Sequence, residues 1–592
     1  MWINQFLSCM VHVIEEDTML KKPGPRSLMR TFSFFVVLLL MLGACGPPSA
    51  GNTSSSSSVG LPVQGGTWID DLFEEPNSLI PNASSETFAG LVDQALYAPL
   101  FVGDTSGHIT PGIATVLPTI ANGGISADAK TWTFHLRPNL KWSDGMPLDA
   151  RDVDFSWRLW TNPGFPAAST IGFNLITSTD ISPDNLTITF HLKQPFSPFL
   201  SVWVDGLSAP LPMHHFQGVA PDRILNSQDN LNPAVTSGPF MMKESNPGDH
   251  YTLIRNPLYY RAAEGLPYLD RVVFHIVTNQ DTILKDLQAG TIDSAWFLDV
   301  SKTIAYQRLS TYTLTSNPNS ESVEAFYFDF HNTILGQHLE VRQAMAMAVD
   351  HLALIKTARR SQAFPLCTDH SKGYIPGYEP NAHCPKFDPT AANAILEQHG
   401  WKMGADGVRT KNGMRLEFEY STTANNVWRT DDELILQSNF KAIGIKLDIQ
   451  NYPASTFLGP FLTGGNPSPP TGAVAGRYDV GEFERTGSYD PDDAALFACS
   501  QFPPAGFNIT FYCNPALDKL HMAEEATTDP AVRQMVFNQI HQVYLTDFPF
   551  VVLYAVADIA MHKKSVHNYM PSPAGASETI NIWQWWCTHG QC

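Results

Sequence analysis

The sequence predicts an α/β protein of two or three lobes, and three observations support this prediction. With 592 residues, the chain is too long for a single hydrophobic core. Hydrophobic residues make up 43% and aromatic residues 11%, which is ample for packed cores and excludes wholesale disorder. Segments with the two-residue period of strands alternate with segments of helical period in both halves of the chain, as they do in α/β lobes.

The first 44 residues have the composition of an export signal. Basic residues between Lys21 and Arg30 precede an apolar run at 32–42, which is about half as long as the ~20 residues that cross a bilayer. The run ends in Leu42-Gly43-Ala44-Cys45, which looks like a bacterial lipobox. We therefore expect residues 1–44 to be a lipoprotein signal peptide and Cys45 to carry a lipid that holds the protein on the outer face of the cell membrane. The alternative is a secretory peptide cut near Ala44, with Cys45 incidental. Residues 45–60 are rich in Ser and Gly and are expected to form a flexible tether.

The expected elements of the first half begin with a strand at 64–69 and a helix at 87–97. In the strand at 131–136, Trp132 and Phe134 share one face, and Asp149 is the expected N-cap of the helix that follows. Residues 186–193 nearly repeat the core of 131–136, which indicates two strands of one small sheet. A helix over 282–294 is closed by Gly290.

The second half continues the alternation. We expect a strand at 325–332 after Glu324, and a single helix over 339–356. Further helices are expected from Asp388-Pro389 to Gly400, over 430–442 and over 531–545. Strands are expected at 445–449 and 550–554, a Pro-rich loop at 466–472 and an aromatic segment at 580–586.

Six cysteines remain once Cys9 and Cys45 are set aside. Six cysteines allow many pairings. In the oxidising compartment that an export signal implies, we expect the local ones. These are Cys367–Cys384, Cys499–Cys513 and Cys587–Cys592. A zinc site is the rival interpretation, but the sequence has no CxxC pair to favour it.

Charge and motifs argue against several classes of function. The formal net charge is −20 and no run of Lys and Arg occurs, which disfavours nucleic-acid binding. The chain has no G-x-S-x-G elbow, no HExxH, no P-loop and no GxGxxG, so we expect no enzyme. His214-His215 is expected in a strand, with the two rings on opposite sides and no metal between them. Asp490, Asp492 and Asp493 lack the Gly and Glu of an EF-hand, and a solvated helix N-terminus capped by Asp490 is expected instead. We therefore expect no metal and no cofactor.

The literal residues of 133–153 are more specific than these patterns. They include Thr133-Phe134-His135-Leu136-Arg137, Trp142-Ser143-Asp144-Gly145, Pro147-Leu148 and Ala150-Arg151-Asp152-Val153. This stretch resembles the signature of the family-5 extracellular solute-binding proteins, the peptide- and nickel-binding components of ABC importers. Similar landmarks recur over most of residues 65–586.

The resemblance implies a periplasmic-binding-protein fold of type II, with two lobes, a hinge and a subdomain inserted in the first lobe. Lobe I would comprise 61–86, 230–318 and 558–592, the insert 87–229, and lobe II 319–557. The protein would be a monomer that closes on a peptide or similar oligomeric solute and delivers it to the permease subunits. Alternatives are an oligosaccharide or nickel-chelate binder, a secreted hydrolase such as a glycosidase, and a receptor-coupled sensor.

The resemblance also implies where a ligand would be held. The expected contacts are Phe88, Trp428, Tyr452, Phe483, Glu484, Arg485, Gly487, Ser488 and Tyr489. In the family, an Asp near the end of this series pairs with the α-ammonium of a peptide, but here the corresponding position is Gly487 or Ser488, neither of which carries a charge. We expect Glu484 or Asp490 to substitute. For each aromatic residue, plain core packing is the alternative.

Overall fold

A computed structural model describes most of the chain beyond residue 60. The described residues are 61–84, 86–316, 321–372, 376–453, 456–458, 462, 478–503, 506–572, 578–590 and 592. The predicted signal peptide, Cys45, the tether and the Pro-rich loop at 466–472 lie outside this set. The chain divides into two compact units, 1–59 and 60–592, and the second of these contains every element named below. Of the helices within the described ranges, none has the length and apolar character needed to cross a membrane.

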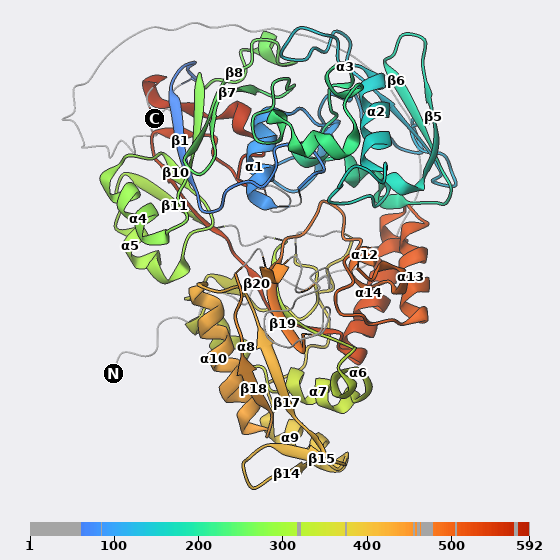
Figure 1. The fold of residues 1–592 in the computed structure, drawn as a ribbon, viewed down its shortest axis with the longest axis vertical. Coiled ribbons are helices and arrows are strands. Elements are labelled where there is room, and N and C mark those ends of the chain that lie inside the picture. The colour runs from blue at the N-terminus through green and yellow to red at the C-terminus, as the bar shows by residue number, and fades with distance from the viewer. Residues whose placement is uncertain are drawn as a thin grey trace, which may run out of the picture. The chain divides into compact units, whose positions relative to one another are not determined.

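A seven-stranded sheet is built from three separate stretches of chain (Figure 1). Its order is β11 (Tyr312–Ser316), β21 (Ile559–Lys563), β10 (Ser294–Ala295), β1 (Thr67–Leu72), β9 (Arg271–Ile276), β8 (His250–Arg255) and β7 (Phe240–Asn246). β1 pairs in parallel with β9 and β10, and the remaining pairs are antiparallel.

Helices cover both faces of this sheet, and successive apolar side chains of β1 point alternately to one face and the other. Trp68 packs with α1 (Thr87–Leu96), whereas Ile69 packs with α4 (Gln280–Ala289). Gly290 ends α4 in the left-handed conformation, at φ 72°, as predicted. Residues of α1 thus share a hydrophobic core with the seven-stranded sheet.

A three-stranded sheet carries the stretch that resembles the family signature. Its order is β4 (Thr131–His135), β6 (Thr187–Leu192) and β5 (Ile176–Ile181). The two strands with near-identical sequences belong to one small sheet, as the sequence predicts, and the structure shows that they pair directly, with Trp132 opposite Phe190. α2 (Ala150–Trp160) begins at Asp149, whose carboxylate accepts from the backbone of Arg151, so the predicted N-cap is confirmed.

Smaller elements complete this region. They are the hairpin of β2 (Phe101–Gly103) and β3 (Ile109–Pro111), and the short helix α3 (Met213–Phe216). His214 and His215 lie in α3 and not in a strand, so that prediction is wrong: Pro212 starts a helical turn here. The two rings contact different carboxylates, His214 Nε2 at 2.8 Å from Asp144 and His215 Nε2 at 3.1 Å from Asp229.

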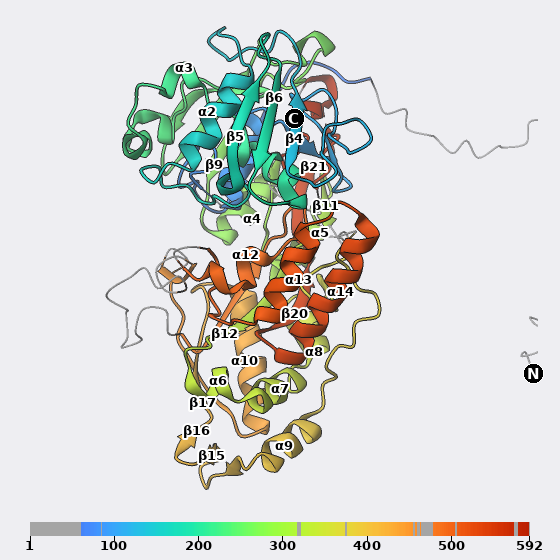
Figure 2. The same cartoon turned by 90° about the vertical axis from the view of Figure 1, so that its right-hand side faces the viewer.

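A six-stranded sheet forms the other main layer (Figure 2). Its order is β13 (Ala363–Phe364), β20 (Phe550–Val556), β12 (Val323–Phe328), β19 (Val480–Arg485), β17 (Glu417–Ser421) and β18 (Lys446–Ile449). One face is covered by α7 (Leu339–Met347), α8 (His351–Thr357), α9 (Pro389–Gln398) and α10 (Val427–Ala442), and the other by α12 (Ala494–Phe497), α13 (Pro515–Glu525) and α14 (Pro530–Asp547).

Alternation along β12 explains these two cores. Phe326 and Phe328 point toward the α10 face, and Ala325 and Tyr327 toward the α14 face. The single helix predicted over 339–356 is wrong, because the chain breaks between α7 and α8 at Asp350, which caps α8 through the backbone N–H of Ala353.

Short elements lie at the edges of the unit. They are α5 (Thr303–Gln307), α6 (Thr333–Gln337), the three strands β14 (Lys402–Met403), β15 (Arg409–Lys411) and β16 (Met414–Arg415), and the pair β22 (Val566–His567) and β23 (Trp586–Cys587). The disulfides are Cys367–Cys384, Cys499–Cys513 and Cys587–Cys592, which are the pairs expected from the sequence.

The chain passes between the two large sheets twice. β11 ends at Ser316 and β12 begins at Val323, and β20 ends at Val556 and β21 begins at Ile559. The second passage consists only of Ala557 and Asp558. The residues beside these passages are therefore placed to contact both sheets.

Candidate ligand-binding site

Three aromatic rings join the two large sheets. Phe297, which follows β10, lies between Phe88 of α1 and Trp428 of α10. Its ring centroid is 6.1 Å from that of Phe88 and 5.8 Å from that of Trp428, both in edge-on arrangements. The structure thus brings Phe88 and Trp428, two of the predicted contacts, to one place. Both side chains are 5–6% exposed, so contacts within the protein already cover most of their surface.

Arg359 links these rings to a group of acidic residues. Its guanidinium lies 5.0 Å from the ring centroid of Trp428 and 5.7 Å from that of Tyr554. Five carboxyl groups lie near this guanidinium or near that of Arg429, and we call them the acidic cluster: Glu324, Asp432, Glu482, Glu484 and Asp558.

The strand register explains why the carboxylates meet. Glu324 of β12 and Glu484 of β19 are direct partners in the antiparallel ladder, and Glu482 lies two residues before Glu484 on the same face. Like charges placed directly opposite each other are unfavourable unless a cation joins them. Arg429 of α10 provides one cation, because its Nε donates to Glu324 Oε1 at 3.0 Å and its Nη1 donates to Thr423 Oγ1 at 2.7 Å.

The acidic cluster has five carboxyl groups, and the guanidinium groups of Arg359 and Arg429 can neutralise only two negative charges. Burial, followed by the neighbouring Asp558 and Glu324, raises the pKa of Glu484 to about 8. Burial raises the pKa of Asp558 to about 6, and the pKa values of Glu482 and Asp432 rise well above the usual range for the same reason. Without a further cation, several of these groups therefore keep their protons near neutral pH.

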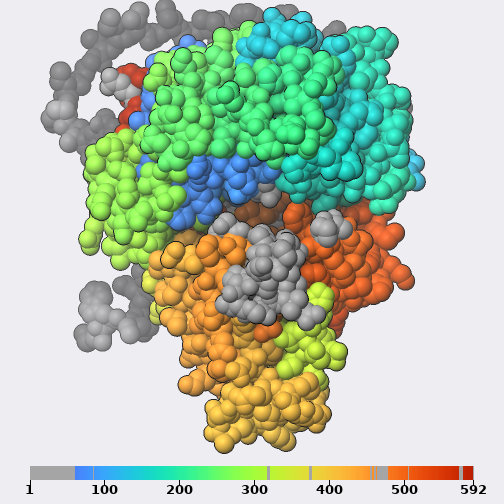
Figure 3. Space-filling view, viewed as in Figure 1, coloured from blue at the N-terminus to red at the C-terminus, as the bar shows by residue number. Residues whose placement is uncertain are grey.

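Part of the acidic cluster remains open to solvent. Glu484 and Asp558 are only partly buried, but the Oε2 atom of Glu484 is itself shielded from water and has no hydrogen-bond partner among the described residues. Glu74, which follows β1, is exposed, yet desolvation by surrounding protein raises its pKa while Arg429 lowers it. A carboxylate that is open to water but surrounded by protein lies in a recess, and Figure 3 shows a shaded indentation between the blue residues near the start of the described chain and the orange and red residues of its second half.

Tyr452 and Phe483 lie on the other face of the six-stranded sheet. The Phe483 ring stacks on Tyr327 at 4.4 Å between centroids, and the Tyr452 hydroxyl donates to Glu419 Oε1 at 3.0 Å. Both residues belong to the core under α13 and α14. They are therefore not brought together with Phe88 and Trp428, and core packing accounts for these contacts.

The predicted residues after β19 cross toward the first sheet. Arg485 Nη2 donates to the backbone oxygen of Asp369 at 2.9 Å. Gly487 is buried, and the exposed Ser488 donates through Oγ to the backbone oxygen of Asp490 at 2.6 Å. The ring of Tyr489 lies against Gly103 of β2, where an added Cβ would come within 2.1 Å of the ring.

Of the two candidates to replace the missing Asp, Asp490 is already engaged. Arg533 donates to both of its carboxylate oxygens at 2.7 Å, a bidentate pair. Asp490 is also not the N-cap of α12, which is Asp493, so that prediction is wrong. Glu484 is the predicted substitute that keeps an unpartnered oxygen among the described residues.

Sequence reasoning missed Glu324, Arg429 and Asp558. Glu324 opens an otherwise apolar strand, and a charge in such a strand is a signal that it has a buried partner. Arg429 and Asp558 carry no comparable signal, because their place depends on the packing of α10 and on the passage between the sheets.

Comparison with known proteins gives a consistent result. Residues 109–502 match the family model "Bacterial extracellular solute-binding proteins, family 5 Middle". The oligopeptide-binding protein AppA of Bacillus subtilis is 25% identical over 574 residues, covering 95% of this chain and 99% of AppA. The glutathione-binding protein GsiB of Pectobacterium atrosepticum is 24% identical over 507 residues, covering 84% of this chain and 90% of GsiB.

Solved structures share the fold. AppA from Bacillus subtilis in complex with a nonapeptide has a TM-score of 0.77 at 22% identity, covering 89% of this chain and 99% of that one. NikZ from Campylobacter jejuni in complex with Ni(L-His) has a TM-score of 0.75 at 22% identity, covering 88% and 99%. The predicted α/β fold of type II periplasmic binding proteins is therefore confirmed.

Proposed function

This chain belongs to the bacterial extracellular solute-binding proteins of family 5, and on this basis we propose that it captures a peptide outside the cytoplasmic membrane and delivers it to an ABC importer. Members of the family bind solutes and are not enzymes. A peptide is favoured as the ligand because the oligopeptide-binding relative AppA aligns over nearly the whole of both chains.

The observation that carries the proposal is the excess of carboxylates beside the passage between the sheets. Without a ligand, burial favours the protonated, uncharged forms of Glu484 and Asp558. A peptide has an α-ammonium group, and this cation would stabilise the ionised carboxylates in their place. Glu484 would thus pair with the α-ammonium group of the peptide, which Gly487 and Ser488 cannot do because neither carries a charge. The rings of Phe88, Phe297 and Trp428 would flank the ligand, and backbone groups of 487–489 would bind its main chain.

Affinity would come from closure of two lobes around the ligand. We place lobe I at 61–86, 230–318 and 558–592 together with α1, the insert after α1 up to residue 229, and lobe II at 319–557. The two passages between the sheets would be the hinge. Contact between Tyr489 and Gly103 would then belong to the closed form, since in this assignment Gly103 lies in the insert and Tyr489 in lobe II.

We also propose that Cys45 anchors the protein to the outer face of the cell membrane. The support is the lipobox-like Leu42-Gly43-Ala44-Cys45 after a short apolar run. Expression with labelled palmitate tests this: the wild type is expected to carry label and fractionate with membranes, and Cys45→Ser to lose both. A labelled Cys45→Ser chain would contradict the anchor without touching the binding proposal.

Ligand binding is tested on protein purified from its own host. Native mass spectrometry is expected to show a co-purified peptide, and that peptide should raise the melting temperature of refolded, ligand-free protein without being cleaved. A panel of oligosaccharides and nickel chelates serves as the comparison. If one of these stabilises the protein and peptides do not, the peptide assignment is wrong; accumulation of a hydrolysis product would refute a binding protein altogether.

A further inference from the structure

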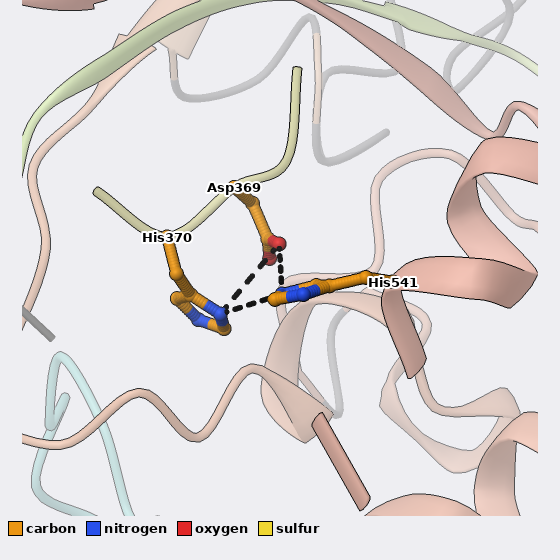
Figure 4. A group of neighbouring side chains, drawn as sticks. All are labelled: Asp369, His370 and His541. Carbon is orange, nitrogen blue, oxygen red and sulfur yellow. Dashed lines mark hydrogen bonds and ion pairs between the residues drawn. The ribbon is translucent and has the colours of Figure 1, made fainter. Parts of the chain in front are cut away.

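A second polar group lies away from the acidic cluster, on the α14 face of the six-stranded sheet. It consists of Asp369 and His370, in the loop between β13 and α9, and of His541 in the middle of α14 (Figure 4). All three residues are at most 1% exposed. The Cys367–Cys384 disulfide closes the loop that carries the first two residues.

Three potential ligand atoms converge in this group. His370 Nδ1 is 3.0 Å from His541 Nε2, His541 Nε2 is 3.3 Å from Asp369 Oδ1, and His370 Nδ1 is 3.7 Å from the same oxygen. A circle through points with these separations has a radius of about 2 Å. For a tetrahedral zinc ion with bonds of about 2.0–2.1 Å, the circle through any three of its ligand atoms has a radius of about 1.9 Å. The triangle therefore fits three ligands of a tetrahedral ion.

The surroundings favour a cation at the centre of this triangle. His541 Nδ1 lies 3.5 Å from Glu379 Oε2, so a proton on Nδ1 would face a carboxylate and would leave the lone pair of Nε2 for a cation beside Asp369 and His370. Neither carboxylate oxygen of Asp369 has a hydrogen-bond donor in good geometry among the described residues. A buried carboxylate that faces a nitrogen lone pair without a donor is costly unless a cation joins them.

The neighbouring charges do not fill that role. Arg485 Nη2 lies 3.5 Å from Asp369 Oδ2, the oxygen on the other side of the carboxylate from the histidines. Asp493 adds a second buried acid, whose Oδ2 accepts from the Tyr544 hydroxyl at 2.7 Å.

We propose that Asp369, His370 and His541 bind a divalent transition-metal ion, zinc by its geometry, which fastens the loop between β13 and α9 to α14. The ligand set of two imidazoles and one carboxylate is one that zinc accepts, and the fourth position is left for Asp493 or a water molecule. The role is structural, because the group is buried. The sequence shows no such motif, since His541 is 171 residues from His370.

The test uses the full mature chain. After dialysis against a metal-free buffer, elemental analysis is expected to find about one zinc per chain, and a strong chelator should lower the melting temperature, which added Zn²⁺ but not Mg²⁺ restores. Titration of the metal-free protein with Co²⁺ should give the intense visible bands of tetrahedral cobalt. If wild type that is folded neither retains nor binds these ions, the group is a hydrogen-bonded histidine pair and the proposal is wrong.

Variants locate the ion. Asp369→Asn and His541→Gln are close to the native shapes and are expected to weaken zinc binding on the order of 100-fold or more. His351→Gln is the matched control, because His351 at the start of α8 lies on the other face of the six-stranded sheet, with its Nδ1 2.8 Å from the backbone oxygen of Leu553. Equal zinc binding by wild type, Asp369→Asn and His541→Gln would place the ion elsewhere and overturn the proposal. If these variants fail to fold, the cobalt titration of wild type still decides.

Discussion

The sharpest consequence of the acidic cluster concerns Glu484. The substitution Glu484→Gln keeps the shape of the side chain and removes its negative charge. Losing one partner of a buried ion pair costs about 3–5 kcal/mol, and the lower end is appropriate because Glu484 is only partly buried. Against this, wild type must first give up the proton of Glu484, whose pKa is about 8, which at pH 7 costs about 1.4 kcal/mol. The net loss is about 1.6 kcal/mol, or roughly 15-fold in Kd.

Isothermal titration calorimetry measures this with the peptide that stabilises the protein most and with its N-acetylated form. Wild type is expected to prefer the free amine, and Glu484→Gln to lose most of that preference. Titration in buffers of different ionisation enthalpy should show release of about 0.9 proton on binding at pH 7, since that fraction of Glu484 is protonated beforehand. Glu433→Gln is the matched control, because Glu433 is a buried carboxylate of α10 that pairs with Asn451.

Equal binding of the free and acetylated peptides by wild type would refute this role for Glu484, as would a Glu484→Gln variant that discriminates as well as wild type does. Stability gives an independent check. The folded-state pKa of Glu484 is raised above 4.5, so the protonated side chain contributes fully to the free energy of unfolding below that pH. This contribution is lost as pH rises toward about 8. Without ligand, the melting temperature of wild type relative to Glu484→Gln should therefore fall between pH 4.5 and 8.

Three further variants test the structure around the site. Arg429→Met leaves the fully buried Glu324 without its ion-pair partner and is expected to lower the free energy of unfolding by about 3–5 kcal/mol. Adding Glu324→Leu to this variant should recover most of that loss. If urea unfolding shows no loss for Arg429→Met alone, the ion pair does not stabilise the fold. Replacing both Cys367 and Cys384 by Ala removes a crosslink across 17 residues and should cost about 3 kcal/mol by chain entropy, so an unchanged urea midpoint would count against that bridge. Gly103→Ala would force the facing tyrosine ring away, and the overpacking should weaken ligand binding by about 1–3 kcal/mol while leaving the melting temperature of the ligand-free protein nearly unchanged; unaltered affinity would show that this contact is not part of closure.

Periodic and local features were predictable from the sequence. Trp132 and Phe134 lie on one face of β4 because side chains in a strand alternate with a period of two residues. The near-identical sequence of β6 indicated that it belongs to the same sheet. Asp149 and Gly290 were predictable as helix ends, since caps depend on side-chain chemistry and φ at one position. The break at Asp350 was not, because apolar residues continue on both sides of it and the cap competes with helix propensity there.

The candidate site was predictable only in part. Phe88 and Trp428 meet across Phe297 as members of one interface, but Tyr452 and Phe483 lie in the opposite core. The difference arises because resemblance gives positions along the chain, whereas the face of a strand decides which neighbours a side chain meets. Nor can sequence spacing show that one carboxylate is held by an arginine and another is not.

One strand, β19, shows how both proposed sites depend on this alternation. Glu484 projects toward α10 and the acidic cluster, while Arg485, the next residue, projects toward α14 and holds Asp369 of the proposed metal site. The chain then turns at Gly487 to reach Gly103 through Tyr489. Because Arg485 is the last residue of β19, fixing Asp369 also fixes the point from which the crossing segment leaves the sheet. A metal ion at Asp369 would therefore act on ligand binding without touching the ligand, by setting where that segment begins.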